Sequence, residues 1–200
     1  LAQGEALGTL LVASSTPLRD WLVNQGVSRA HAIDEPIDLL PRTRTAVSSR
    51  TSKLRAVFIG SAANVAALDL VNRVLAREEF RDIALQVVSD RPWATVAWSP
   101  VTTRQALLDA DIALLPCLDT PAAQLKSANR LTLFLSAGLA TICSALPSYA
   151  PLIAAGGAIA ASSEEQWASA LRTLRSPAQR AAIGDRGAAL VWEQFAPERI

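Results

Sequence analysis

A run of polar and basic residues near the middle of the chain has the composition of an anion-binding site: Lys126, Ser127, Ala128, Asn129 and Arg130. It opens an apolar pattern of helical period, and the start of a helix presents free backbone N–H groups and a partial positive charge. Two cations and two short hydrogen-bonding side chains at such a start would suit a diphosphate. A plainer interpretation stays open, in which the serine is an ordinary N-cap and both cations face solvent.

Five further candidate residues follow apolar runs that predict strands: Gly60, Ser61, Trp98, Ser99 and Asp119. In open parallel sheets ligands bind at the carboxyl ends of the strands, so these loops would gather at one edge. The glycine would let a ligand approach the backbone closely, or simply make a turn. The tryptophan would stack on a nucleobase or pack against the domain, and packing is the favoured interpretation. The aspartate would bind a sugar hydroxyl or cap its own loop.

Other kinds of catalytic site are not legible in the sequence. The chain has one histidine, His31, and two cysteines, Cys117 and Cys143, which lack the spacing of metal ligands. We therefore expect no metal and no cofactor, and we expect both cysteines to be buried free thiols. Such thiols fit a reducing compartment, so a cytoplasmic location is expected. The acids within residues 34–38 are expected to be solvated or to cap a crossing between domains.

The composition indicates a folded protein with a sizeable core. Hydrophobic residues make up 50% of the 200 residues and charged residues 18%. The net charge of +1 provides no electrostatic footprint for nucleic acid. Residues 131–161, the most apolar stretch, are interrupted by glycine and proline, whereas a membrane span needs about 20 unbroken apolar residues. The chain begins at Leu1 and contains no Met, so we expect a piece of a longer protein, without a membrane span.

Short apolar runs alternate along the chain with patterns of helical period. This rhythm predicts an α/β fold, a Rossmann-like parallel sheet with helices on both faces. Strands are expected at residues 9–13, 30–33, 54–59, 84–88, 94–98, 111–115, 139–143 and 158–160. Helices are expected at residues 16–24, 64–77, 102–108, 129–137 and 148–153, followed by two helices with capping signals at Ser163 and Ser176.

Residues 41–53 differ from the rest of the chain because they are polar, basic and rich in serine and threonine. This composition predicts a linker. The expected division is a remnant of a preceding Rossmann-like domain at residues 1–40, the linker at 41–53, and the main domain at 54–200.

Four segments carry a resemblance to a known family: DIALLP at 111–116, KSANR at 126–130, SAGLATI at 136–142 and SALPSY at 144–149. In this order they resemble the C-terminal domains of GT-B glycosyltransferases, in particular those of the family 4 type. Residues 192–200 resemble the final helix region, which in the family crosses back to the first domain. Residues 11–18 and 35–38 resemble the end of the N-terminal domain and the crossover.

The resemblance implies two Rossmann-like domains that face each other across a cleft, with the nucleotide sugar bound by the C-terminal one. The family usually requires no metal, because helix starts and basic side chains stabilise the leaving diphosphate. By position, Lys126, Ser127, Asn129 and Arg130 would bind the phosphates, Gly60 and Ser61 would line the cleft, and Trp98 or Ser99 would lie near the base. The expected partners are a nucleotide sugar and the chain's own N-terminal domain, and peripheral membrane contact of the whole protein stays open.

One departure from the family pattern bears on the donor site. Many family 4 enzymes carry a pair of glutamates there, and Leu125 and Leu133 occupy those positions here; Ala140 stands where proline is usual. Asp119 is a candidate substitute acid. We therefore predict the donor-binding domain of a glycosyltransferase, inactive as a fragment, with a non-catalytic GT-B-like binding or scaffold domain as the alternative. A generic Rossmann-type nucleotide binder is a third, weaker hypothesis, because the sequence has no glycine-rich fingerprint.

Overall fold

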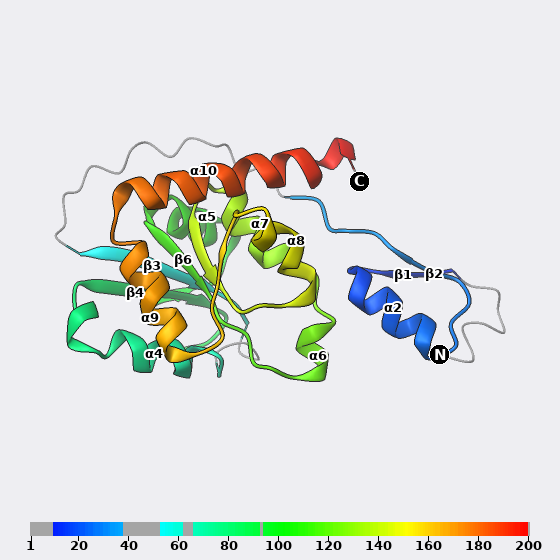
Figure 1. Ribbon diagram of the computed structural model, residues 1–200, viewed down its shortest axis with the longest axis horizontal. Coiled ribbons are helices and arrows are strands. Elements are labelled where there is room, and N and C mark those ends of the chain that lie inside the picture. Colours follow the sequence, from blue (N-terminus) through cyan, green and yellow to red (C-terminus); the bar gives the residue numbers. More distant parts are fainter. Residues whose placement is uncertain (1–9, 38–52, 62–65, 93, 200) are drawn as a thin grey trace.

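The computed structural model describes residues 10–37, 53–61, 66–92 and 94–199, which form two units of unequal size (Figure 1). In the smaller unit, β1 (Leu11–Ala13) and β2 (Ala30–Ala32) pair in parallel, and α2 (Thr16–Asn24) connects them. Ser15 is the N-cap of α2, and its hydroxyl oxygen accepts the Leu18 N–H at 3.1 Å. The strands and helix that the sequence predicted in this region are confirmed.

The larger unit is built on a six-stranded parallel sheet in the order β5-β4-β3-β6-β7-β8. Its strands are β3 (Leu54–Ile59), β4 (Ile83–Ser89), β5 (Val96–Ala97), β6 (Ile112–Leu115), β7 (Ala140–Cys143) and β8 (Ile159–Ala160). The chain moves outward from β3 to β4 and β5, and then returns to place β6 on the other side of β3. A reversal of this kind opens a crevice outside the carboxyl ends of β3 and β6.

Helices cover both faces of this sheet, as the sequence predicted. One face carries α5 (Pro100–Asp109), α7 (Asn129–Ser136), α10 (Pro177–Gln194), η2 (Pro147–Tyr149) and α8 (Ala150–Ala154). The other face carries α4 (Leu68–Leu75), η1 (Glu78–Phe80) and α9 (Glu164–Thr173). Side chains along β6 point alternately to the two faces of the sheet, so the core has two parts. Ala113 and Leu115 pack on the first face, and Ile112 and Leu114 pack on the second.

Two glycines let α10 approach the sheet and its connections closely. A β-carbon at Gly184 would lie 2.3 Å from the carbonyl oxygen of Gly138, and one at Gly187 would lie 2.8 Å from the carbonyl oxygen of Gly157. Gly138 follows α7 with a φ of 70°, a conformation that glycine adopts without steric cost. The close packing of α10 against α7 fixes the helix whose start carries the predicted anion site.

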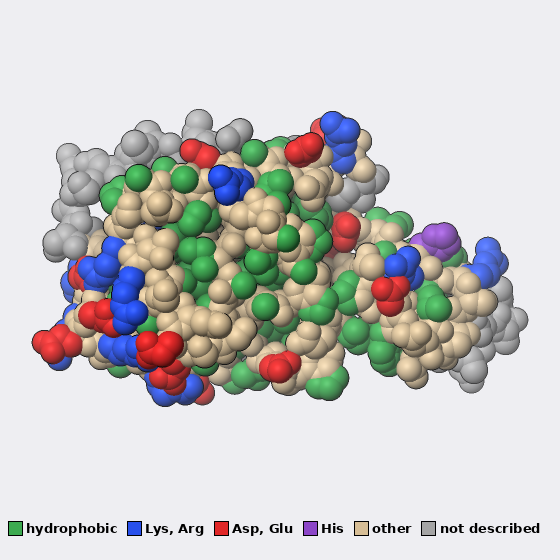
Figure 2. All heavy atoms as spheres, viewed as in Figure 1, with side chains coloured by type: hydrophobic (Ala, Val, Ile, Leu, Met, Phe, Trp, Pro, Cys, Tyr) green, Lys and Arg blue, Asp and Glu red, His purple; other side chains and the backbone are tan. Residues whose placement is uncertain are grey.

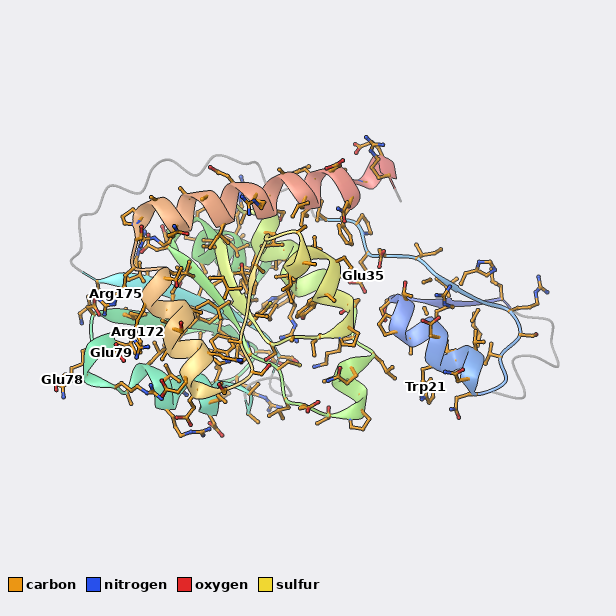
Figure 3. All side chains as sticks on the ribbon, in the orientation of Figure 1. Trp21, Glu35, Glu78, Glu79, Arg172 and Arg175 are labelled. Atoms are coloured by element: carbon orange, nitrogen blue, oxygen red, sulfur yellow. The ribbon has the colours of Figure 1, made fainter. Side chains whose placement is uncertain are left out.

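Charged side chains gather over η1, α4 and α9, whereas the middle of the face in Figure 2 is largely uncharged. Arg172 Nη2 lies 2.7 Å from Glu79 Oε1, and Arg175 Nη2 lies 2.6 Å from Asp82 Oδ1. Both guanidinium groups also lie over the Phe80 ring, 6.0 and 5.8 Å from its centroid. Figure 3 shows the two arginines near Glu79. These contacts fasten α9 to η1 on the outside of the molecule.

Several element bounds differ from the sequence-based expectations. The helix α5 begins at Pro100, earlier than expected, because Ser99 is its N-cap and forms a capping box with Thr102. Three short elements were not predicted, α6 (Pro121–Gln124), η1 and η3 (Pro197–Arg199), since so few residues show no helical period. Of the helix expected from residue 64, the structure describes α4, and residues 62–65 lie outside the described residues. The predicted linker lies almost wholly outside them as well, so the domain division stays a prediction.

Candidate functional site

The loop after β3 and the start of α7 meet at the carboxyl ends of β3 and β6, where the strand order reverses. A β-carbon at Gly60 would lie 3.4 Å from Nη1 of Arg130 and 2.7 Å from the ring of Phe58. The Gly60 N–H donates to the Val88 carbonyl oxygen at 3.1 Å, which extends the pairing of β3 with β4 beyond the end of β3. The structure thus brings together two predicted site residues that lie far apart in the sequence. Because Gly60 has no side chain, its backbone is open beside Arg130.

The start of α7 has no side-chain cap. Its N-cap is Ala128, so the interpretation of Ser127 as an ordinary N-cap is wrong. The first turn contains no acidic residue, and the first N–H groups of any helix lack intrahelical partners. Asn129, the first residue of the helix, is exposed. This helix start is therefore suited to an anion from outside the helix.

The two cations of the predicted anion site are held against the crevice. Lys126 and Arg130 are both half-buried, and Nη1 of Arg130 is a buried atom. Lys126 Nζ lies 3.8 Å from the Sγ atom of Cys117, which follows β6 closely. Both side chains are thus partly covered, and their role in binding an anion stays a prediction.

Ser144 ties the end of β7 to the end of β6, a role that the sequence analysis missed. Its hydroxyl oxygen accepts the Cys117 N–H at 2.9 Å and donates to the Cys117 carbonyl oxygen at 3.3 Å. The resemblance included this serine in the SALPSY segment without a role. The two bonds hold the loop after β6 at the crevice, next to Lys126.

A buried thiol and a buried phenol lie near the same edge. Burial raises the pKa of Cys143 to about 12. Burial also raises the pKa of Tyr149 well above its usual range, although the positive charge of Arg130 opposes the shift. Both groups are protonated at neutral pH, so neither is an ionised nucleophile. The expectation of a buried free thiol is confirmed for Cys143, whereas Cys117 is only half-buried.

The Trp98 side chain is 56% exposed, so the favoured prediction that it packs against the domain is wrong. Its backbone N–H donates to the Ser89 carbonyl oxygen at 2.8 Å, which holds the backbone to β4 while the ring stays outside. The ring follows the short strand β5, which lies at the edge of the sheet. The hydroxyl of Ser99 is engaged as the α5 cap, accepting the Thr102 N–H at 3.1 Å.

The positions where the family carries glutamates are apolar in the structure as in the sequence. Leu133 packs against the core and Leu125 is half-buried. Asp119, the candidate substitute, is exposed and accepts a hydrogen bond from Gln124 Nε2 at 2.9 Å. This bond joins two side chains, so both interpretations of Asp119 stay predictions. Ser61 is exposed, directly after Gly60 at the carboxyl end of β3.

The smaller unit contacts the loop that leads into α7. The nearly fully buried Ser15 hydroxyl donates to the Leu125 carbonyl oxygen at 2.8 Å. The Ser127 hydroxyl donates to Glu35 Oε2 at 3.4 Å. Figure 3 shows Glu35 on the segment that runs from β2 toward the larger unit. Glu35 was expected either to be solvated or to cap a crossing between domains, and its contact with Ser127 matches the second alternative. No feature of the sequence indicated that Ser127 would be its partner.

A groove of about 460 Å³ lies elsewhere, along β3, β4, β5 and the end of α5. Polar groups in its lining already bond within the chain: Arg55 pairs with Asp111 at 3.3 Å, and the Thr95 hydroxyl bonds to the backbone of Val87. The groove lies away from the carboxyl edge of the sheet, and none of the predicted site residues lines it.

Two further findings concern the described part of the chain. It contains no group of three His, Cys, Asp or Glu side chains placed to hold a metal ion. None of its helices combines the length and apolar character that a membrane crossing needs.

Comparisons with known proteins identify the fold. No protein-family model matches the sequence, and no curated protein matches it. Among solved structures, WaaG, a glycosyltransferase involved in lipopolysaccharide biosynthesis, is similar over 92% of this chain, with a TM-score of 0.66 and 17% identity. HepE of Anabaena, solved with UDP and glucose, is similar over 94% of this chain, with a TM-score of 0.71 and 9% identity. TarM is similar over 94%, with a TM-score of 0.71 and 10% identity.

These matches cover 58% of the WaaG chain, 59% of the HepE chain and 41% of the TarM chain. The chain thus spans between two fifths and three fifths of the length of each structure that it resembles. At this level of identity the likeness establishes the fold, and it leaves the activity to be argued from the site.

Proposed function

From the GT-B glycosyltransferase fold of this chain, we propose that it is the donor-binding part of a glycosyltransferase. The nucleotide sugar binds in the crevice outside β3 and β6, with its diphosphate at the start of α7. The observation that carries the proposal is the packing of Arg130 beside Gly60, at the point where the strand order reverses. Ligands of open α/β sheets bind at such points.

The chemistry follows from the groups at the α7 start. In the transfer reaction the bond between the anomeric carbon and the phosphate oxygen breaks, and negative charge develops on the departing diphosphate. The first N–H groups of α7, Lys126 and Arg130 stabilise that charge, and Ser127 and Asn129 add hydrogen bonds. This set of donors neutralises a diphosphate without a metal ion. Gly60 and Ser61 let the ligand lie against the backbone at the end of β3.

The nucleobase stacks on Trp98 in this proposal. The exposed ring lies at the carboxyl end of β5, two strands from β3 in the sheet order. Two strand spacings amount to roughly 10 Å, a distance that a nucleoside diphosphate can span. Structures of HepE and TarM contain UDP, which makes UDP the first nucleotide to test.

The test is titration calorimetry of this chain with UDP, ADP, GDP and the corresponding nucleotide sugars. Saturable heat with at least one of them is expected, and Lys126→Ala combined with Arg130→Ala should abolish it. Arg81→Ala combined with Arg104→Ala is the matched control, because it removes the same charge from exposed positions, one directly after η1 and one on α5. Absence of saturable heat with every nucleotide would refute the proposal.

A second candidate function rests on Leu125 and Leu133, which leave the donor site without the glutamates of the family. A GT-B-like binding or scaffold domain that has lost its donor chemistry fits that observation. Transfer or hydrolysis of a sugar by the whole protein, with the acceptor part present, would exclude this candidate. Under the first proposal, by contrast, the isolated chain should bind the donor without transferring its sugar.

We assign the smaller unit to the end of a preceding Rossmann-like domain and residues 54–200 to the donor domain. Large apolar side chains of the smaller unit are 40–58% exposed: Leu10, Val12, Trp21, Val23 and Ile33. A three-residue strand pair and one helix cannot bury such residues alone, whereas the rest of a domain would. A cytoplasmic location, and peripheral contact of the whole protein with a membrane, stay predictions.

A further inference from the structure

Glu35 reaches the proposed phosphate site from the smaller unit. Its Oε2 atom lies 3.4 Å from Ser127 Oγ, across a sequence separation of 92 residues. The glutamate is half-buried, and it stands on the segment that crosses between the units (Figure 3). Since α7 has no acidic residue in its first turn, this carboxylate is an anion that another part of the chain brings to the helix start.

The contact with Glu35 and a contact with phosphate are mutually exclusive for Ser127. A serine hydroxyl has one hydrogen to donate, and an ionised carboxylate and a phosphate oxygen both only accept. Ser127 therefore cannot donate to Glu35 and to a diphosphate at the same time. The carboxylate and the diphosphate also repel each other, because both carry negative charge at one helix start.

We propose that Glu35 is an autoinhibitory latch, which holds the Ser127 hydroxyl beside the start of α7 until a nucleoside diphosphate displaces it. This inference rests on the donor site proposed above. Binding of the diphosphate breaks the Glu35–Ser127 contact and turns the Glu35 side chain away from the site. Donor binding and the side-chain conformation of Glu35 are therefore coupled.

The backbone around Glu35 confines the movement that release requires. The Ile33 N–H donates to the Ala13 carbonyl oxygen at 2.9 Å, and the Ile37 N–H donates to the Phe195 carbonyl oxygen at 2.9 Å. The hydrogen bond from Ser15 to Leu125 also holds the units together, independently of Glu35. A change of side-chain rotamer at Glu35 is enough to clear the site, with these anchors in place.

The test is the affinity of wild type and Glu35→Gln for UDP at low salt. Glutamine keeps the shape and removes the charge, so the variant should bind UDP more tightly, on the order of 3- to 10-fold. Asp34→Asn is the matched control, since it removes the same charge from the adjacent, exposed position and should leave the affinity unchanged.

Equal or weaker binding of UDP by Glu35→Gln overturns the latch, and weaker binding would make Glu35 a ligand contact instead. If wild type and variant both fail to bind any nucleoside diphosphate, the donor site itself is refuted and the latch falls with it. If Glu35→Gln binds UDP with the same affinity as the wild type, the latch is refuted and the donor site stands.

Discussion

Gly60 and Arg130 meet at the reversal point of the sheet, where a β-carbon on the glycine would stand 3.4 Å from Nη1 of the arginine. The same β-carbon would stand 2.7 Å from the Phe58 ring, closer than non-bonded carbon atoms approach. The lack of a side chain at Gly60 thus leaves room for the Phe58 ring and keeps the backbone open beside the cationic start of α7.

The first prediction concerns Gly60→Ala. The added methyl group should destabilise the fold by about 1–3 kcal/mol through overpacking and should weaken nucleotide binding by displacing Arg130. The control is Gly26→Ala, which meets no atom within 4 Å but has a φ of +91°, so it should cost about 1–2 kcal/mol through backbone strain alone. Urea unfolding and UDP calorimetry measure the two effects. Equal UDP affinity in Gly60→Ala and wild type would contradict the assignment of this loop to the site.

The second prediction concerns the exposed ring at the end of β5. Trp98→Ala should weaken UDP binding on the order of tenfold, because the stacking surface is lost, and should change stability by less than about 1 kcal/mol. Trp21→Ala removes a ring that is 40% exposed on the smaller unit and serves as the control. Both variants are measured by calorimetry and by urea unfolding. A similar loss of affinity in the two variants would argue against stacking at Trp98.

The third prediction concerns pH and the charged contacts between α9 and the helices α4 and η1. A hydrogen bond from Arg172 lowers the pKa of Glu79, and one from Arg73 lowers the pKa of Glu164. A lowered pKa in the folded state means that stability is present above the unfolded pKa of about 4.3 and is lost as the pH falls through the folded values. The free energy of unfolding should therefore decrease between about pH 5 and pH 3.

The double variant Glu79→Gln with Glu164→Gln should be less stable at neutral pH and should lose less stability on acidification. Added salt should narrow the gap between wild type and variant, since both contacts are exposed to solvent. Glu193→Gln, on an exposed position of α10, is the control for a change in total charge. Parallel pH profiles for wild type and the double variant would rule out these carboxylates as the source of the acid sensitivity.

Local chemistry allowed much of the fold to be predicted. Leu54–Ile59 is a run of apolar and β-forming residues that ends at a glycine, and it forms β3 with the expected bounds. Ser163 and Gln166 have capping-box spacing, and they form that box at the start of α9. The alternation of such segments predicted the parallel sheet with helices on both faces. This was possible because each strand or helix pattern spans only a few neighbouring residues.

Predictions failed where neighbours in space decide the outcome. Trp98 was expected to pack, and it is exposed at the end of β5, a short strand at the edge of the sheet. Ser127 was a plausible N-cap by type, but α7 begins one residue later and the hydroxyl bonds to Glu35 instead. Neither result could be obtained from the residues beside these positions.

Residue patterns along the chain were enough to predict the class of fold, most of its elements and the basic helix start at residues 126–130. The folded structure was needed to find that Arg130 lies beside Gly60, that Ser15 bonds to Leu125 and that Glu35 reaches Ser127. Strands and caps depend on short-range sterics and hydrogen bonding, which leave a pattern in neighbouring residues. Contacts between distant segments depend on the order of strands in the sheet and on the packing of the two units, which no local pattern records.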